Sequence, residues 1–179
     1  QHGEYKLVLA ESCTAGYVAV MLGEIPGISK HLCGSLVTYR THSKRRWLGV
    51  KKKQIKEFTT ESQPVADSMA KLALKRTPEA DYALSIVGHL GPNAPKDKDG
   101  VIWVSIARRT RKGNIKIKER MEYICSANHD TPNGVALRTA RRAEATEAAL
   151  TALASHLHKL IRSSPKDGSK GLKSEKQQR

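Results

Sequence analysis

The stretch Ala10-Glu11-Ser12-Cys13-Thr14-Ala15-Gly16 decides the fold. The apolar run Tyr5–Ala10 leads into it and predicts a buried strand. Its last residues open a second segment, Thr14–Leu22, that predicts a helix. Ser12 therefore lies at a turn between a strand and a helix, which is how an α/β layered fold begins.

Ser12 is a candidate nucleophile, because such a turn presents a hydroxyl beside open backbone N–H groups. The start of a helix stabilises negative charge, so the N–H groups around Cys13, Thr14 and Ala15 are candidates for an oxyanion hole. The competing interpretation is that Ser12 or Thr14 only caps the helix.

A second stretch supplies a tyrosine and a lysine. Residues Leu32–Tyr39 predict a strand, and the helix expected over His42–Leu48 carries Lys44. Ligands bind at the carboxyl ends of the strands in open α/β sheets. Ser12, Tyr39 and Lys44 are therefore expected to meet there if the two strands are neighbours.

Lys44 is the candidate base for the serine. Burial lowers the pKa of a lysine, and nearby positive charge from Arg40, Arg45 and Arg46 would lower it further. The alternative is that Lys44 is one more exposed cation in a basic run.

The order and spacing of these residues resemble the CinA C-terminal domain family, which includes the nicotinamide-nucleotide amidases (NMN deamidases). The resemblance covers most of the chain, from about Tyr5 to about Leu160. It rests on A-E-S-C-T-A-G, then I-P-G-I-S, then V-T-Y followed by S-K and L-G-V. Ser85–Pro92 stands where the family has its S/T-G-I-A-G-P loop, and Gly100–Val104 resembles its V-G-x-V-W-x strand. The family's catalytic serine, tyrosine and lysine fall on Ser12, Tyr39 and Lys44.

The resemblance implies hydrolysis of the carboxamide of nicotinamide mononucleotide, with no metal and no cofactor. It implies a nucleotide substrate whose phosphate is bound by the loop that holds Gly88, His89 and Gly91. Arg138 and Arg142 are four residues apart on a predicted helix, so they are expected to present two guanidinium groups on one face toward that phosphate. It also implies a homodimer.

Several positions depart from the family pattern. The second glycine after S-C-T is Ala15, the usual Ser and Asn after the tyrosine are Arg40 and Thr41, and the hydroxyl residue before Gly88 is Val87. The later glycines of the loop are also missing, and such glycines let backbone N–H groups approach a phosphate. These changes keep open a rival reading: a member with altered or lost catalysis that binds a nucleotide or a protein partner.

The remaining pattern predicts a single three-layer α/β/α domain over residues 1–162, with a mixed, mostly parallel sheet. A turn at residues 112–114 is expected to pair the last two strands antiparallel. The other expected strands are Tyr82–Val87, Val101–Ala107 and Ile115–Ile124, and the other expected helices are Ser62–Arg76 and Val135–Ile161.

The formal net charge is +15, and the cations gather in Arg40–Lys53, Arg108–Arg120 and residues 163–179. The last of these segments has almost no apolar content, which predicts a disordered basic tail. Such charge attracts nucleic acid, but aromatic residues are only 4% and form no evident stacking platform. Nucleic acid is therefore a possible partner that the sequence does not favour.

The chain has three cysteines, Cys13, Cys33 and Cys125. An odd number without metal-ligand spacing predicts a reducing, cytoplasmic setting. Cys13 is a rival nucleophile, because a helix start lowers the pKa of a thiol. No apolar segment approaches the roughly 20 residues of a membrane span, so no membrane partner is expected.

Overall fold

The computed structural model describes residues 5–127 and 134–163 of the 179-residue chain. Apart from its first residue, Ser163, the predicted basic tail lies outside the described residues. Among the helices of the described ranges, none combines the length and the apolar character needed to cross a membrane.

Five strands form one mixed sheet in the order β2-β1-β3-β4-β5. Strand β1 (Leu7–Glu11) lies between β2 (Leu32–Val37) and β3 (Tyr82–Gly88) and is parallel to both. Strand β4 (Val101–Arg109) runs antiparallel to β3, and β5 (Ile115–Ile124) runs antiparallel to β4. The predicted mixed α/β sheet is confirmed, with two parallel and two antiparallel pairings.

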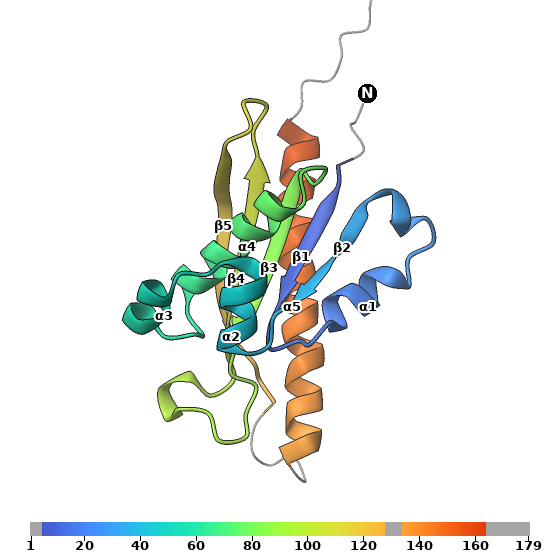
Figure 1. Cartoon of the computed structure of the whole chain (residues 1–179). Coiled ribbons are helices and arrows are strands. Elements are labelled where there is room, and N and C mark those ends of the chain that lie inside the picture. The colour runs from blue at the N-terminus through green and yellow to red at the C-terminus, as the bar shows by residue number, and fades with distance from the viewer. Residues whose placement is uncertain (1–4, 128–133, 164–179) are drawn as a thin grey trace, which may run out of the picture.

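Helices cover both faces of the sheet, which gives the predicted three layers (Figure 1). Helix α4 (Gln63–Arg76) packs on one face, and α1 (Tyr17–Gly23) and α5 (Gly134–Ser163) pack on the other. Side chains alternate between the faces: Val8 points toward α4, whereas Leu9 joins the cluster under α1 and α5.

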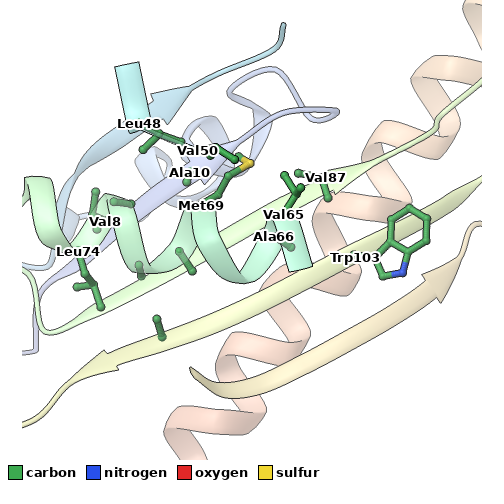
Figure 2. Close-up of a cluster of buried hydrophobic side chains, with 14 of the residues drawn as sticks. Val8, Ala10, Leu48, Val50, Val65, Ala66, Met69, Leu74, Val87 and Trp103 are labelled. Atoms are coloured by element: carbon green, nitrogen blue, oxygen red, sulfur yellow. The ribbon is translucent and has the colours of Figure 1, made fainter. Parts of the chain in front are cut away.

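Figure 2 shows the cluster on the α4 face. Met69 and Val65 of α4 pack there beside Ala10 of β1, and all three are fully buried. Leu48 and Val50, which follow Lys44 in the chain, lie in the same cluster. The residues that follow Lys44 therefore anchor its segment in the core.

Short elements complete the fold: η1 (Ile28–Lys30), α2 (Thr41–Ser43), η2 (Lys44–Leu48), α3 (Lys52–Phe58) and η3 (Lys96–Lys98). The helix predicted over His42–Leu48 is thus two elements, a turn of α-helix that widens into the π-helix η2. Helix α3 was not predicted, because its run of lysines carries a weak apolar pattern.

Candidate active site

Ser12 lies at the carboxyl end of β1 and is 4% exposed. Its backbone N–H donates to the Ile86 carbonyl oxygen of β3 at 3.0 Å, which fixes the start of the turn. Helix α1 begins after Gly16, whose φ of +97° suits a glycine, and neither the Ser12 nor the Thr14 hydroxyl accepts a hydrogen bond from its first N–H groups. The interpretation that Ser12 or Thr14 serves only as the cap is therefore wrong.

Lys44 is completely buried, and its ammonium nitrogen lies beside Ser12. The Lys44 Nζ–Ser12 Oγ distance is 2.7 Å. Lys44 Nζ also donates to the carbonyl oxygens of Thr38 at 3.0 Å and Tyr39 at 3.3 Å. The alternative that Lys44 is a surface cation is wrong, and the predicted meeting of the serine and the lysine is what the structure shows.

Burial lowers the pKa of Lys44, while the charge of Glu61 and the thiol of Cys13 act in the opposite direction. The expected help from Arg40, Arg45 and Arg46 is not found, because these three side chains are exposed to solvent. Three oxygen atoms surround Nζ, namely the two carbonyl oxygens and the Ser12 hydroxyl oxygen, and an ammonium group satisfies them with its three donors. After loss of one proton, the amine keeps two donors for the carbonyl oxygens and has a lone pair for the Ser12 hydroxyl.

The π-helix η2 positions Lys44. The carbonyl oxygen of Lys44 accepts hydrogen bonds from the N–H groups of both Gly49 and Val50, each at 3.1 Å. Gly49 ends the element with a φ of +92°, a conformation that favours glycine. Single-turn π-helices are frequent at functional sites. Here the wide turn directs Lys44 inward while Leu48 stays in the core.

Glu11 is a functional residue that the sequence reasoning missed. It is completely buried at the end of β1. Its carboxylate accepts five hydrogen bonds, all between 2.7 and 3.1 Å, from the Thr14 and Ser35 hydroxyls and the N–H groups of Gly16, Val18 and Ala19. The available signal was a carboxylate at the end of an otherwise apolar strand.

The carboxylate of Glu11 occupies the start of α1, so that helix start does not serve an oxyanion as predicted. The N–H of Ala15 is also engaged, since it donates to the Ser12 carbonyl oxygen at 3.1 Å. The N–H groups of Cys13 and Thr14 make no hydrogen bond to another residue within the described ranges. These two donors remain the candidates for an oxyanion hole.

The surroundings of Cys13 argue against a nucleophilic role for its thiol. Burial raises the pKa of its thiol to about 12, which outweighs the opposing effect of Lys44. The expectation of a lowered pKa is wrong because the side chain is 5% exposed. All three cysteines, Cys13, Cys33 and Cys125, are free thiols, as the predicted absence of a disulfide framework requires.

Ser12 and Tyr39 open into a cavity of about 190 Å³. The loop after β3 forms one wall, and the predicted Gly88, His89 and Gly91 all line it. Arg138 lines it as well. The other lining residues are Cys13, Glu61, Leu90, Pro92, Asn93 and Ala94.

Arg142 does not reach this cavity, contrary to the prediction. Its guanidinium carbon lies 5.5 Å from the centre of the Tyr17 ring, on α1. Because Arg138 and Arg142 are four residues apart, they lie on the same side of α5 but about 6 Å apart along the helix axis. Of these two arginines, Arg138 is the one that is level with the loop.

Arg138 connects the loop to Tyr39. Its Nη1 donates to the Gly91 carbonyl oxygen at 2.7 Å, and its Nη2 donates to the Tyr39 hydroxyl. The expected relay through that hydroxyl has no counterpart here, because Tyr39 contacts Lys44 through its carbonyl oxygen instead. Tyr39 therefore acts as a wall of the cavity and as a partner of Arg138.

A partly buried ion pair supports the loop. Arg141, 4% exposed, donates to both carboxylate oxygens of Asp99 at 2.7 and 2.9 Å. A Cβ on Gly91 would lie 2.8 Å from the Arg141 guanidinium, and one on Gly88 would lie 2.5 Å from the Val101 carbonyl oxygen. The two glycines are thus needed for packing as well as for lining the cavity.

No group of three or more histidine, cysteine or carboxylate side chains that could hold a metal ion occurs among the residues with described positions. The chemical groups that converge on the cavity are a serine, a buried lysine and an arginine. His89 adds an imidazole, with its Nε2 3.7 Å from a carboxylate oxygen of Glu61.

Comparison with known proteins decides the family. The model of the CinA C-terminal domain matches residues 1–157. The chain belongs to the CinA C-terminal domain family. It is 37% identical over 101 residues to a CinA-like protein of Gloeothece citriformis, a match that covers 55% of this chain and 24% of the relative. In this relative and four other curated relatives, the matched part spans between 24% and 31% of the relative's length.

Solved structures of the superfamily share the fold. A CinA superfamily protein of Klebsiella pneumoniae superposes with a TM-score of 0.71 at 25% identity, over 87% of this chain and 89% of that one. The competence/damage inducible protein CihA of Agrobacterium tumefaciens gives a TM-score of 0.65 at 28% identity, over 84% of this chain and 85% of that one. The predicted fold class and family are both confirmed.

Proposed function

We propose that this CinA-type domain is an amidohydrolase that converts nicotinamide mononucleotide to nicotinic acid mononucleotide and ammonia. One observation carries the proposal: the 2.7 Å contact between Ser12 Oγ and the fully buried Lys44 Nζ. A hydroxyl beside a desolvated amine is the arrangement by which a serine is activated without a histidine. The resemblance to the nicotinamide-nucleotide amidases supplies the substrate.

The first half-reaction acylates Ser12. Neutral Lys44 accepts the hydroxyl proton as Ser12 Oγ forms a bond to the amide carbon. The carbonyl oxygen becomes an oxyanion, and the N–H groups of Cys13 and Thr14 are the donors available to it. When the C–N bond breaks, Lys44 returns the proton to the departing nitrogen and ammonia leaves.

The second half-reaction regenerates the enzyme. A water molecule takes the place of ammonia, Lys44 accepts its proton, and the hydroxide oxygen attacks the ester carbon. The C–Oγ bond then breaks, and Ser12 recovers its proton from Lys44. The same amine serves as base and acid in both halves, which requires a pKa below that of a free lysine.

The loop and Arg138 are proposed to hold the phosphate. Among the described residues, Arg138 is the one arginine or lysine that lines the Ser12 cavity, and its guanidinium already bonds the Gly91 carbonyl oxygen. The cavity of about 190 Å³ is smaller than the roughly 300 Å³ at which ligand pockets usually begin. It therefore holds the nicotinamide end, and the ribose phosphate extends past Arg138.

The experiment is to incubate the purified protein with nicotinamide mononucleotide and to measure ammonia and the acid product together. Equal amounts of both are expected. Nicotinamide riboside, which lacks only the phosphate, is the matched control and is expected to react at least about tenfold more slowly, since a charge-assisted contact to Arg138 is lost. Ammonia without the acid would show that another bond is cleaved.

The second candidate function is nucleotide binding without turnover. It is favoured by the departures from the family pattern at Arg40, Thr41 and Val87. Saturable binding of nicotinamide mononucleotide with no release of ammonia would support this candidate over the amidase.

Replacing Cys13 with alanine is expected to leave turnover within about threefold of wild type and to cost about 1–2 kcal/mol of unfolding free energy, because the thiol fills buried space. Ammonia release and urea unfolding measure the two quantities. A loss of turnover with an unchanged fold would assign the thiol a chemical role that its raised pKa argues against.

A further inference from the structure

A second, larger hollow adjoins the Ser12 cavity. It has a volume of about 530 Å³ and lies where β2 runs into α2 and η2. Tyr39 lines both spaces, so the two meet at this side chain. We call it the Tyr39–Trp47 hollow; its lining residues are Val37, Tyr39, Arg40, His42, Ser43 and Trp47.

Trp47 is the unusual member of this set. It is 59% exposed, although it comes only three residues after the fully buried Lys44. The π-helix η2 thus turns the lysine inward and leaves the indole at the surface. The second tryptophan of the chain, Trp103, is 8% exposed and donates its indole N–H to Glu122. An indole presented to solvent beside a hollow is suited to stacking on a planar ring.

One arginine lines the hollow and two more lie close to the indole in the chain. Arg40 lines the hollow, and Arg45 and Arg46 directly precede Trp47. None of the three forms an ion pair with another residue in the part of the chain that the structure describes. The backbone of Arg40 is fixed, because its N–H and carbonyl oxygen both bond the Ser43 hydroxyl, at 3.1 and 2.8 Å. A planar aromatic face and unpaired guanidinium groups together recognise a ring that carries an anion.

We propose that the Tyr39–Trp47 hollow binds a second nucleotide unit, with its base on Trp47 and its phosphate at Arg40. The volume of the hollow falls within the range of small-molecule sites, whereas the Ser12 cavity falls below it. The substrate class is then a dinucleotide amide: the amide end reaches Ser12, and the second nucleotide lies beyond Tyr39. This orientation rests on the proposed amidase function, but binding in the hollow does not.

Calorimetric titration with AMP tests the binding without any turnover. Saturable binding is expected in the wild-type protein, with the affinity reduced at least about tenfold in Trp47→Ala and in Arg40→Ala. The matched controls are Phe58→Ala, an exposed aromatic on α3, and Arg162→Ala, an exposed arginine near the end of α5. Both are expected to bind AMP as wild type does. Absence of saturable AMP binding by the folded protein would overturn the proposal.

A short oligothymidylate distinguishes a nucleotide site from a surface that attracts any polyanion. The triple variant Lys51→Ala, Lys52→Ala, Lys53→Ala removes three exposed cations outside the hollow. It is expected to leave AMP binding unchanged. If it weakens AMP binding as much as Arg40→Ala does, or if only the oligonucleotide binds, the hollow is not a nucleotide site.

Turnover tests the orientation. In Trp47→Ala, the KM for the dinucleotide amide NAD is expected to rise at least about tenfold, while the KM for nicotinamide mononucleotide stays the same. An equal rise for both substrates would contradict the assignment. If the wild-type protein releases no ammonia from either compound, the amidase proposal fails, and the AMP titration alone decides whether the hollow binds a nucleotide.

Discussion

Replacing Lys44 with methionine is expected to lower amide turnover at least about a hundredfold and to leave the protein folded. Methionine has a similar length and suits the fully buried position, but it can neither accept nor return a proton. Steady-state ammonia release measures the first effect, and circular dichroism checks the second.

Lys56→Met is the matched control, because it makes the same substitution at an exposed lysine on α3. Its turnover is expected to equal that of wild type. Retention of more than about a tenth of wild-type activity by the folded Lys44→Met protein would show that Lys44 is not the base.

The pH dependence of the wild-type protein follows from the lowered pKa of Lys44. Only the neutral amine accepts a proton, so kcat/KM is expected to rise with pH through this lowered pKa and to level off below 10.5, the ordinary value for lysine. A flat profile over that range would contradict the role of Lys44 as base.

Stability shifts in the same direction with pH. Between the lowered folded-state pKa of Lys44 and 10.5, the unfolded chain binds more protons than the folded one, so the Lys44 contribution to unfolding free energy grows as pH rises. The raised pKa of Cys13 acts oppositely above 9.0, where the folded state binds more protons. Comparing wild type with Lys44→Met largely cancels the Cys13 effect, and the difference is expected to move in favour of wild type with increasing pH.

Replacing Glu11 with glutamine is expected to cost about 2–4 kcal/mol of unfolding free energy and to lower kcat about tenfold or more. The change removes the negative charge that accepts five hydrogen bonds. It also places the glutamine N–H₂ group, which is itself a donor, against other donors. Because these bonds hold the turn that follows Ser12, the hydroxyl loses its fixed position. Urea unfolding and separate kcat and KM values measure both effects.

Ser35→Ala is the control for Glu11. It removes one of the five donors, while the same carboxylate oxygen keeps its bond from the Ala19 N–H. A cost of about 0.5–1.5 kcal/mol and near wild-type kcat are expected. If Glu11→Gln is no more destabilising than Ser35→Ala, the carboxylate does not organise the turn.

The sequence was sufficient to predict the sheet, its mixed pairing and the meeting of Ser12 with Lys44. These features depend on local sequence patterns. One is an apolar run that ends in small residues, and the other is a strand followed by a helix that carries a lysine in its first turn. Parallel neighbours bring their carboxyl ends to one edge, so placing β1 beside β2 was enough to bring the serine and the lysine together.

The remaining site depends on tertiary contacts that no local pattern encodes. The five bonds of Glu11 include one from Ser35, 24 residues away. Adjacent positions on a helix point in directions about 100° apart. Arg141 therefore reaches Asp99, whereas its neighbour Arg142 lies over the Tyr17 ring. The pKa of Cys13 was predicted in the wrong direction, because the prediction considered the helix start, which lowers a thiol pKa, and left out burial, which raises it.

Ammonia release from nicotinamide mononucleotide by wild type and by Ser12→Ala tests the central claim most directly. The substitution removes only the hydroxyl oxygen that lies 2.7 Å from Lys44 Nζ, and the fold is expected to persist. Release by wild type and none by the folded variant is the predicted result. Equal release by both proteins would contradict the assignment of Ser12 as the nucleophile.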